Sequence, residues 1–247
     1  MRATVRYLIL SDIHANLQAL EAVLAAAADW DRLLVLGDLV GYGADPNGVI
    51  DHIRELSPLA VIRGNHDKAS CGLDTGSSFN QVARLAAAWT EQHLTPGNRD
   101  YLRQLPSGPT EIDDRLELCH GAPFDEDHYI FDMFDAQRAL EAATRPVCVF
   151  GHTHLPVLFT LRDATLRADV PDEEPQAIEL TTDAAYLLNP GSVGQPRDGD
   201  PRAAFGIYES GERFLFRRVP YDVASAQRRI AEAGLPQPLA LRLALGR

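Results

Sequence analysis

Five short apolar segments, each followed at once by polar residues, constrain this chain more than any other feature of its sequence. The segments are Tyr7–Leu10, Leu33–Leu36, Leu59–Ile62, Leu116–Cys119 and Val147–Phe150. A short apolar run between turn signals is typical of a strand that is buried on both faces. The residues that follow the segments are SDIHAN, GDLVGYG, RGNHD, HGAP and GHTH. Because ligands bind outside the carboxyl ends of parallel strands, the pattern predicts that these polar groups meet at one edge of one sheet.

The polar residues after these segments are of the kinds that bind divalent metal ions. The set comprises Asp12, His14, Asp38, Asn65, His66, His120, His152 and His154. Carboxylate, imidazole and amide oxygen without thiolate favour Mn, Fe or Zn over a zinc finger. A lone histidine at a strand end more often has a structural role than a metal-binding one. Here, however, polar residues able to bind metal follow five separate segments, and chance would have to place them there each time. We therefore predict a metal site.

Two segments carry pairs of candidate ligands separated by one residue, Asp12-x-His14 and His152-x-His154. In extended backbone, residues i and i+2 point the same way, so each pair is expected to face one ion. His66 directly follows Asn65, and neighbours in extended backbone point to opposite sides. His66 is therefore not expected to bind the same ion as Asn65.

Composition restricts the classes of protein that remain. The 247 residues carry a net charge of −12, and Arg-Arg pairs at 217–218 and 228–229 are the main basic clusters. Nucleic-acid binding is therefore not expected, whereas a small phosphorylated substrate is compatible because divalent ions reverse the local field. Three scattered cysteines indicate a reducing compartment, and we expect a cytoplasmic protein with no signal segment and no membrane span.

The order of predicted elements favours an α/β fold in a single domain, residues 1–247. Helices are predicted at 17–27, 46–56, 80–93, 135–143 and 222–233, and alternation with strands indicates a mainly parallel sheet. Further strands are predicted at 155–162, 176–180, 185–188, 203–209 and 212–218, with a surface excursion at 163–175. The apolar tail from Leu235 either packs on the body or forms a contact between copies in a homo-oligomer, and the sequence does not decide between them.

The pattern D-x-H…GD…GNHD…H…GHTH resembles the signature of the calcineurin-like metallophosphoesterases. It spans residues 12–154, and NPGSVGQPRDGDPRA at 189–203 is similar to the small prokaryotic phosphodiesterase branch of that family. The resemblance implies a four-layer α/β/β/α sandwich in which helices flank two mixed sheets. It also implies two divalent metal ions, with Mn favoured and Fe, Zn or Ni as alternatives.

The resemblance gives a role to each matching residue. It places the first metal on Asp12, His14, Asp38 and His154. It places the second on Asp38, Asn65, His120 and His152, so that Asp38 bridges the two ions. A hydroxide shared by both ions would then attack the phosphorus in line. His66 would be a general acid or a hydrogen-bond donor to the phosphate, and Asp67 would either orient it or serve only as a turn residue.

Three more residues are predicted near the substrate. Asn16 is either the N-cap of the first helix, a partner of the metal ligands, or both. Ser192 lies in NPGSVG, whose exposed N–H groups would bind an anion or only hold a tight turn. Arg197 would reach a substrate phosphate or remain a solvated loop residue. His128 and Tyr129 are further candidates for the lining of the pocket.

The leading hypothesis is a metal-dependent phosphodiesterase acting on small nucleotide-type phosphoesters. A phosphomonoesterase, a protein phosphatase or a dinucleoside polyphosphate hydrolase is the alternative, because the metal ligands would be the same. A non-catalytic interaction scaffold on the same fold is a third hypothesis, and the complete ligand set argues against it. GYGADP lacks the third glycine of a dinucleotide fingerprint, and Pro190 occupies the first glycine position of a G-x-S-x-G motif.

Overall fold

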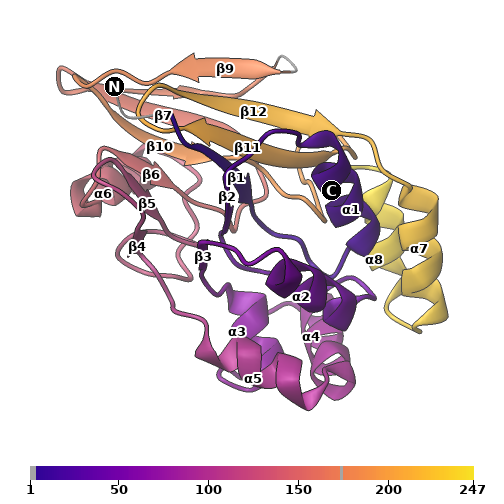
Figure 1. The fold of residues 1–247 in the computed structure, drawn as a ribbon. Helices are drawn as coiled ribbons and strands as arrows, with labels where there is room; N and C mark the ends of the chain where they lie inside the picture. Colours follow the sequence, from indigo (N-terminus) through magenta and orange to yellow (C-terminus); the bar gives the residue numbers. More distant parts are fainter. Residues whose placement is uncertain (1–3, 173–174) are drawn as a thin grey trace.

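Two mixed sheets lie face to face in the middle of the molecule (Figure 1). The structure is a computed structural model that describes residues 4–172 and 175–247. The first sheet has the strand order β3 (Ala60–Val61), β2 (Arg32–Val35), β1 (Arg6–Leu10), β11 (Ala203–Glu209), β12 (Arg213–Val219) and β9 (Gln176–Glu179). The second has the order β4 (Thr110–Glu111), β5 (Leu116–Leu118), β6 (Val147–Val149), β10 (Ala185–Asn189), β7 (Val157–Arg162) and β8 (Thr165–Asp169).

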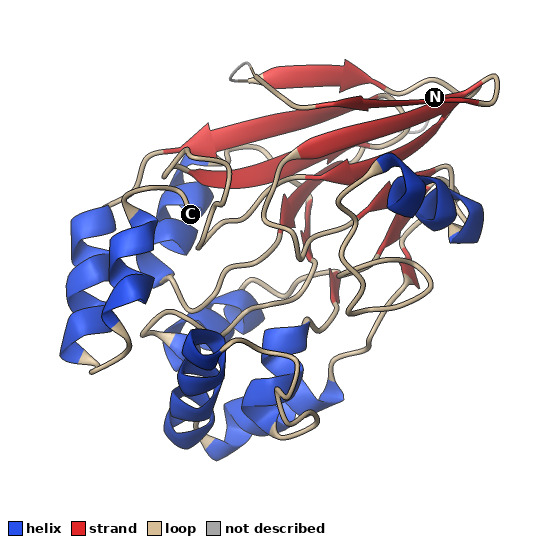
Figure 2. Ribbon diagram, turned by 180° about the vertical axis from the view of Figure 1, so that it is seen from behind, coloured by secondary structure: helices blue, strands red, loops and turns tan. Residues whose placement is uncertain are grey.

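Helices cover the outer faces of both sheets, as Figures 1 and 2 show from opposite sides. The helices of the described residues are α1 (Leu17–Ala26), α2 (Pro46–Glu55), α3 (Asn65–Cys71), α4 (Gln81–His93), α5 (Pro96–Gln104), α6 (Met133–Ala142), α7 (Val223–Glu232) and α8 (Gln237–Leu243). Of these, α3 packs against α4 and α5, which in turn contact α2. Helix α1 contacts β11 and β12 of the first sheet, and α6 contacts β10 and β8 of the second. The predicted four-layer α/β/β/α sandwich is confirmed.

The alternation of side chains along the strands fills two kinds of core. Leu8 and Leu10 of β1 point outward to the cluster that includes α1, whereas Ile9 points between the sheets. There it packs in one cluster with Leu118 of β5 and Val149 of β6. Because burying one such side chain contributes about 1.5–3 kcal/mol, both faces of β1 fix its position. This strand therefore holds the loop after Leu10 at a defined place.

The expectation of one mainly parallel sheet is wrong. Strands β1, β2 and β3 are parallel neighbours in the first sheet, and β5 and β6 are parallel neighbours in the second. The strands from the second half of the chain pair mostly antiparallel, as β11 does with β1. Apolar runs reveal buried strands but not their partners. The five ligand-bearing segments thus approach the same place from two sheets instead of one.

Several helices and strands differ from their predicted form. Helix α4 ends at His93, as predicted, but the TPGN that follows it also opens α5, which was not predicted. The Thr95 side chain accepts from Asn98 N at 3.3 Å and Pro96 fits the first turn. Helix α3 was not predicted. The surface excursion at 163–175 contains strand β8, which forms a hairpin with β7, and residues 173–174 lie outside the described part.

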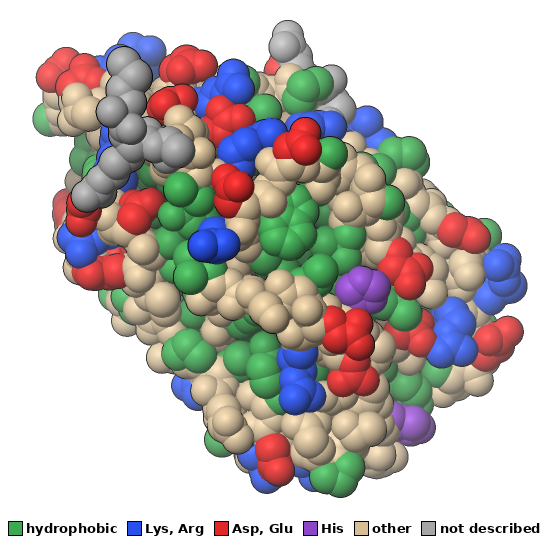
Figure 3. Space-filling view, in the orientation of Figure 1, with side chains coloured by type: hydrophobic (Ala, Val, Ile, Leu, Met, Phe, Trp, Pro, Cys, Tyr) green, Lys and Arg blue, Asp and Glu red, His purple; other side chains and the backbone are tan. Residues whose placement is uncertain are grey.

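The apolar tail packs on the body of the protein. Leu239 and Leu243 of α8 are buried in a cluster with Ile230 of α7, Ala83 of α4 and Tyr42. The first of the two alternatives for the tail is therefore the observed one. Within the described residues, no helix has the length and apolar character needed to cross a membrane. Acidic and basic side chains are interspersed on the face drawn in Figure 3.

Candidate metal centre

The expected ligands lie directly after strands, and most of them have unusual backbone. Asp12, His14, Asp38, His152 and His154 have φ values of 53°, 50°, 52°, 67° and 62°. This left-handed conformation is uncommon for residues other than glycine and costs on the order of 1–3 kcal/mol at each position. The expectation that the two ligand pairs use extended backbone is wrong. Their side chains converge because the chain turns sharply after each strand.

Hydrogen bonds between the loops hold this backbone in place. Asp12 N donates to Gly37 O at 3.1 Å, and His14 N donates to Asp38 O at 2.9 Å. Gly194 N in the loop after β10 donates to Asp12 O at 3.0 Å. Because the strained residues lie in a network that spans several loops, the arrangement is fixed by the fold and not by each loop alone.

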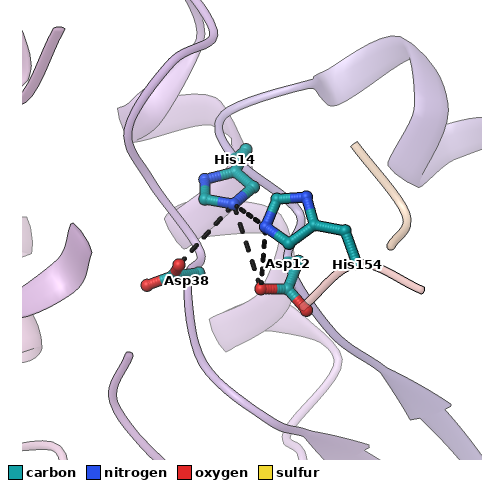
Figure 4. Close-up of side chains that lie close together, drawn as sticks. All are labelled: Asp12, His14, Asp38 and His154. Atoms are coloured by element: carbon teal, nitrogen blue, oxygen red, sulfur yellow. Dashed lines mark hydrogen bonds and ion pairs between the residues drawn. The ribbon is translucent and has the colours of Figure 1, made fainter. Parts of the chain in front are cut away.

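The first group of donors consists of Asp12, His14, Asp38 and His154 (Figure 4). All four side chains are buried, and one ligand atom from each lies within 4.8 Å of the others. The Nε2 atoms of His14 and His154 are 3.0 Å apart. His154 Nε2 lies 3.3 Å from Asp12 Oδ1, and His14 Nε2 lies 3.6 Å from Asp38 Oδ2. Four donor atoms therefore surround one small space.

The second group consists of Asp38, His120 and His152, again within 4.8 Å of one another. His120 Nε2 lies 3.5 Å from Asp38 Oδ2 and 3.4 Å from Asn65 Oδ1. Asp38 is thus common to both groups. His152 belongs to this group and His154 to the first, so the expectation that this pair faces one ion is wrong.

The outward-facing nitrogens of the histidines fix which nitrogen carries the proton. In three of the rings Nδ1 contacts a backbone carbonyl. The contacts are His14 to Val40 O at 3.1 Å, His120 to Leu36 O at 2.7 Å and His154 to Gln195 O at 2.6 Å. Because a carbonyl only accepts, Nδ1 carries a hydrogen in all three rings. In His14 and His154, whose pKa burial lowers, Nε2 therefore presents a lone pair to the centre. In His152 the two ring nitrogens exchange these roles, since Nε2 is the nitrogen that contacts a backbone carbonyl, Asp127 O, at 3.1 Å.

Burial keeps most of these imidazoles neutral. Desolvation lowers the pKa of His14, His152 and His154 well below the ordinary value. The facing Nε2 lone pairs of His14 and His154 repel each other at 3.0 Å unless a cation lies beside both. Neutral imidazoles with inward lone pairs are the form that binds metal. The donor set therefore fits a divalent metal ion.

Asp38 and His120 shift the pKa of each other in opposite directions. Burial would raise the pKa of Asp38, but the charges of His120 and His66 outweigh it and hold the pKa well below the ordinary range. Burial would lower the pKa of His120, but Asp38 raises it to about 10. The Asp38 carboxylate is thus stabilised by a neighbouring positive charge, here the protonated His120 ring. A bound metal ion would replace the proton of His120 as the source of that charge.

Two glycines of the motifs make room for these side chains. A Cβ on Gly64 would lie 2.1 Å from Asp38 Oδ1, and a Cβ on Gly41 would lie 2.5 Å from His66 Nδ1. Gly41 also has φ of +87°, which disfavours any L side chain. The glycines of RGNHD and GDLVGYG are therefore part of the construction of the site.

His66 lies in the first turn of α3 and not in the extended backbone assumed from the sequence. Its ring packs against Tyr42 at 4.3 Å, Phe79 at 4.5 Å and His14 at 5.0 Å between ring centroids. Its Nδ1 is buried and has no hydrogen-bond partner among the described residues, and burial lowers the pKa of the ring to about 4. The main-chain N–H of His66 donates to the proposed ligand Asp38, at Oδ1, over 2.8 Å. His66 therefore stands beside the donor groups as a neutral ring.

Asp67 is buried and holds backbone. Its carboxylate accepts from Gly64 N at 3.0 Å and from Val40 N at 3.2 Å. The hydrogen bonds described for this side chain do not include the His66 ring, which differs from the orienting role expected of Asp67. It instead joins the loop that carries Asp38 to the start of α3.

Asn16 and Ser192 are also occupied by the fold. Asn16 caps α1, as predicted, since its Oδ1 accepts from Ala19 N at 3.1 Å, and its Nδ2 donates to Gly194 O at 2.9 Å. Ser192 is buried, its Oγ donates to Asp12 O at 2.8 Å, and it accepts from Gln195 N at 2.8 Å. Both side chains hold the loop of Asp12, so neither offers its polar atoms to a substrate in this structure.

A cleft of about 460 Å³ opens beside the second group. Its lining includes Asn65, His66, Phe79, Tyr129 and His152. Of the pocket residues expected from sequence, Tyr129 lies in it, whereas His128 contacts Asp135 of α6 at 2.9 Å. Phe79 was missed, because an apolar residue in a loop carries no signal of chemistry.

Two arginines stand near the first group. Arg197 Nη2 lies 3.4 Å from Tyr42 Oη and 3.1 Å from Gln195 Oε1. Its Nε is buried, with no hydrogen-bond partner in the part of the chain that the structure describes. Arg242 of α8 lies over the same Tyr42 ring, with Cζ 5.7 Å from the centroid. Arg197 was predicted near the substrate, but Arg242 was not, because no motif links the tail to the ligand loops.

This fold and this buried donor set are those of a metal-dependent phosphoester hydrolase. The model of the calcineurin-like phosphoesterase superfamily domain matches residues 5–212, and the chain belongs to this family. The family predicted from the motif resemblance is confirmed.

Relatives match over most of the chain. The uncharacterized protein MJ0912 of Methanocaldococcus jannaschii is 33% identical over 97% of both chains. Phosphodiesterase YfcE of Escherichia coli is 26% identical, over 81% of this chain and 85% of its own. The crystal structure of a metallophosphoesterase from Sphaerobacter thermophilus is 40% identical, covers 99% of this chain and 100% of its own, and superposes with a TM-score of 0.87.

Proposed function

We propose that this phosphoester hydrolase is a binuclear metal-dependent phosphodiesterase that acts on small nucleotide-type phosphoesters. The observation that carries the proposal is the position of Asp38 Oδ2, which lies 3.6 Å from His14 Nε2 and 3.5 Å from His120 Nε2. One carboxylate oxygen is thus shared by two groups of buried donors. A shared carboxylate between two donor groups is what a pair of neighbouring cations requires.

The proposed ligands follow the two groups. The first ion would be held by Asp12, His14, Asp38 and His154, and the second by Asp38, Asn65, His120 and His152. The oxygen and imidazole donors suit Mn, with Fe, Zn or Ni as alternatives. Two such ions, when bound, supply Lewis-acid stabilisation of phosphoryl oxygens and an activated water as nucleophile. The chain then needs no covalent nucleophile of its own.

The remaining chemistry falls to side chains around the cleft. His66 lines the cleft beside Asn65 and packs between Tyr42 and Phe79, and its ring N–H would donate to the phosphate or to the leaving oxygen. Arg197 adds positive charge near the first group, and its planar guanidinium suits phosphate oxygens. These residues would bind and orient the ester while the metals act on it.

Preference for a diester is supported by one comparison. The relative YfcE carries the name of a phosphodiesterase and shares 26% identity over 81% of this chain. The same ligands would serve a phosphomonoesterase, so the substrate must be tested directly.

The experiment compares hydrolysis of bis-p-nitrophenyl phosphate and p-nitrophenyl phosphate by protein loaded with Mn²⁺, stripped by chelation and reloaded. We expect turnover that depends on metal and favours the diester. The variant His52→Ala is a matched control, because this histidine lies in α2 away from both donor groups. Preference for the monoester would replace the proposal by a phosphomonoesterase. Absence of turnover in protein that holds two ions would favour a binding role.

A further inference from the structure

A row of aromatic rings leads away from the metal centre. The Tyr129 ring stacks on His152, with centroids 3.7 Å apart and planes at 22°. Phe131 stacks on Tyr129 at 5.2 Å with planes at 4°. The three rings therefore form one stack that begins at a proposed metal ligand and runs outward through the loop before α6.

The outer part of this stack is open to solvent. Tyr129 is 38% exposed and Phe131 is 63% exposed. Tyr129 also lines the cleft together with Asn65 and His66. Large exposed aromatic rings beside a cleft provide a surface on which a flat ligand can stack, because aromatic rings attract one another in offset stacked arrangements.

We infer that the stack of Tyr129 and Phe131 is the platform for the nucleobase of the substrate. The inference rests on the proposed function and names its substrate class, a nucleoside phosphoester whose phosphate lies at the metal centre while its base packs against these rings. Stacking of one base on an aromatic side chain strengthens binding by roughly 5- to 150-fold. Because every base has a flat face, the platform selects nucleosides and not one particular base.

The neighbouring exposed rings do not share this geometry. Arg138 of α6 lies over Phe124 and Phe134, with Cζ 4.4 Å and 5.9 Å from their centroids. Phe134 is 71% exposed, even more than Phe131, but has no described stacking contact with Tyr129. Exposure alone therefore does not define the platform, and Phe134 provides a matched control.

The test measures inhibition of bis-p-nitrophenyl phosphate hydrolysis by 5′-AMP and by ribose 5-phosphate, which differ only in the base. Each inhibition constant is determined on Mn²⁺-loaded protein at the KM of that variant. Phe131→Ala should raise the constant for AMP about tenfold and that for ribose 5-phosphate less than about twofold. Phe134→Ala should change neither. Tyr129→Leu should weaken AMP binding, and Tyr129→Phe should restore it.

Three results would overturn the inference. The first is that AMP binds wild-type protein no more tightly than ribose 5-phosphate does. The second is that Phe131→Ala and Phe134→Ala change the inhibition constant for AMP equally. The third is that Phe131→Ala dissociates a dimer in sedimentation and leaves AMP binding intact, which would mean that a second copy covers the rings. Turnover of the diester by wild-type protein would still support the proposed function. If there is no turnover, calorimetry of both ligands with the Mn²⁺-loaded protein tests the platform separately.

Discussion

The two halves of the metal centre share Asp38 but differ in their access to solvent. Asp12, His14 and His154 are at most 1% exposed, and none of them lines the 460 Å³ cleft. On the other side, Asn65 and His152 both line it. An enclosed donor group excludes water, which strengthens its electrostatic hold on a cation, whereas an open group leaves room for another ligand. Under the proposed function, the enclosed half would retain an ion, and the open half would meet the substrate through the side that carries Asn65 and His152.

Replacement of the shared ligand should have the largest effect. Asp38→Ala removes a donor from both halves and leaves His120 without its carboxylate. We expect kcat/KM for the diester to fall by at least about a thousandfold, the loss typical of removing an essential electrostatic group. Metal analysis should show that both ions are lost. Retention of one tightly bound ion would mean that Asp38 serves only one half.

Removal of one ligand from each half should separate the two sites. His154→Ala should abolish the tighter of two classes of Mn²⁺ binding, and His152→Ala should weaken only the other, each with a loss of activity of roughly a hundredfold or more. Calorimetric titration of metal-free protein measures both classes. Equal affinities in the wild-type protein, or equal effects of the two variants, would contradict the division into an enclosed and an open half.

His66 should affect the reaction without holding metal. His66→Ala and His66→Gln are expected to lower kcat roughly 100-fold or more, because a donor to the phosphate or leaving oxygen is lost. Metal content should stay at the wild-type value in both variants. If either variant emptied the centre, the assignment of His66 to the open half as a donor would be wrong.

Gly41→Ala should act on the same ring indirectly. The new methyl would lie 2.5 Å from His66 Nδ1 on a backbone with φ of +87°, so the ring or the loop must shift. We expect kcat to fall roughly tenfold or more with both ions retained, since misplacement by about 1 Å can cost a hundredfold. Wild-type kcat in a folded Gly41→Ala protein would show that the position of His66 is not critical.

Ser192→Ala should have the smallest effect of these substitutions, and it should change stability, because Ser192 holds the loop of Asp12 in the enclosed half. The Ser192 hydroxyl donates to Asp12 O and accepts from Gln195 N, so its loss takes the partner of the buried Gln195 N–H, whereas Asp12 O keeps its bond from Gly194 N. The free energy of unfolding should drop by about 1–3 kcal/mol in urea titrations of metal-free protein. KM for the diester should not change. A large rise in KM with unchanged stability would instead indicate the substrate contact first expected of this residue.

The sequence predicts which side chains gather at the centre, because both of its signals are local. A buried strand requires a short apolar run, and the residues after it need only lie close in the chain, as in GHTH. The same locality explains the errors. The left-handed backbone of Asp12 and His152 depends on hydrogen bonds from other loops, and the division of the strands between two sheets depends on pairing over long distances.

The surroundings of the site were harder to predict than its donors. Arg242 reaches Tyr42 from the last helix, 200 positions away in the chain, and no motif marks it. The stack of Tyr129 and Phe131 lies in a loop, where aromatic residues carry no periodicity. Asp67 and Ser192 are polar residues within motifs, so the sequence suggests that they act on the substrate. In the fold both side chains are buried, and their hydrogen bonds go to backbone groups. Burial and partners, which only the fold supplies, distinguish such roles.

The central claim is that one carboxylate, Asp38, joins two metal ions. Electron paramagnetic resonance of the protein loaded with two equivalents of Mn²⁺ tests it most directly, because ions bridged by a shared ligand are magnetically coupled. We predict the spectrum of a coupled Mn²⁺ pair in the wild-type protein and its loss in Asp38→Ala. Binding of one equivalent only, or a spectrum of two isolated Mn²⁺ ions, would contradict the account.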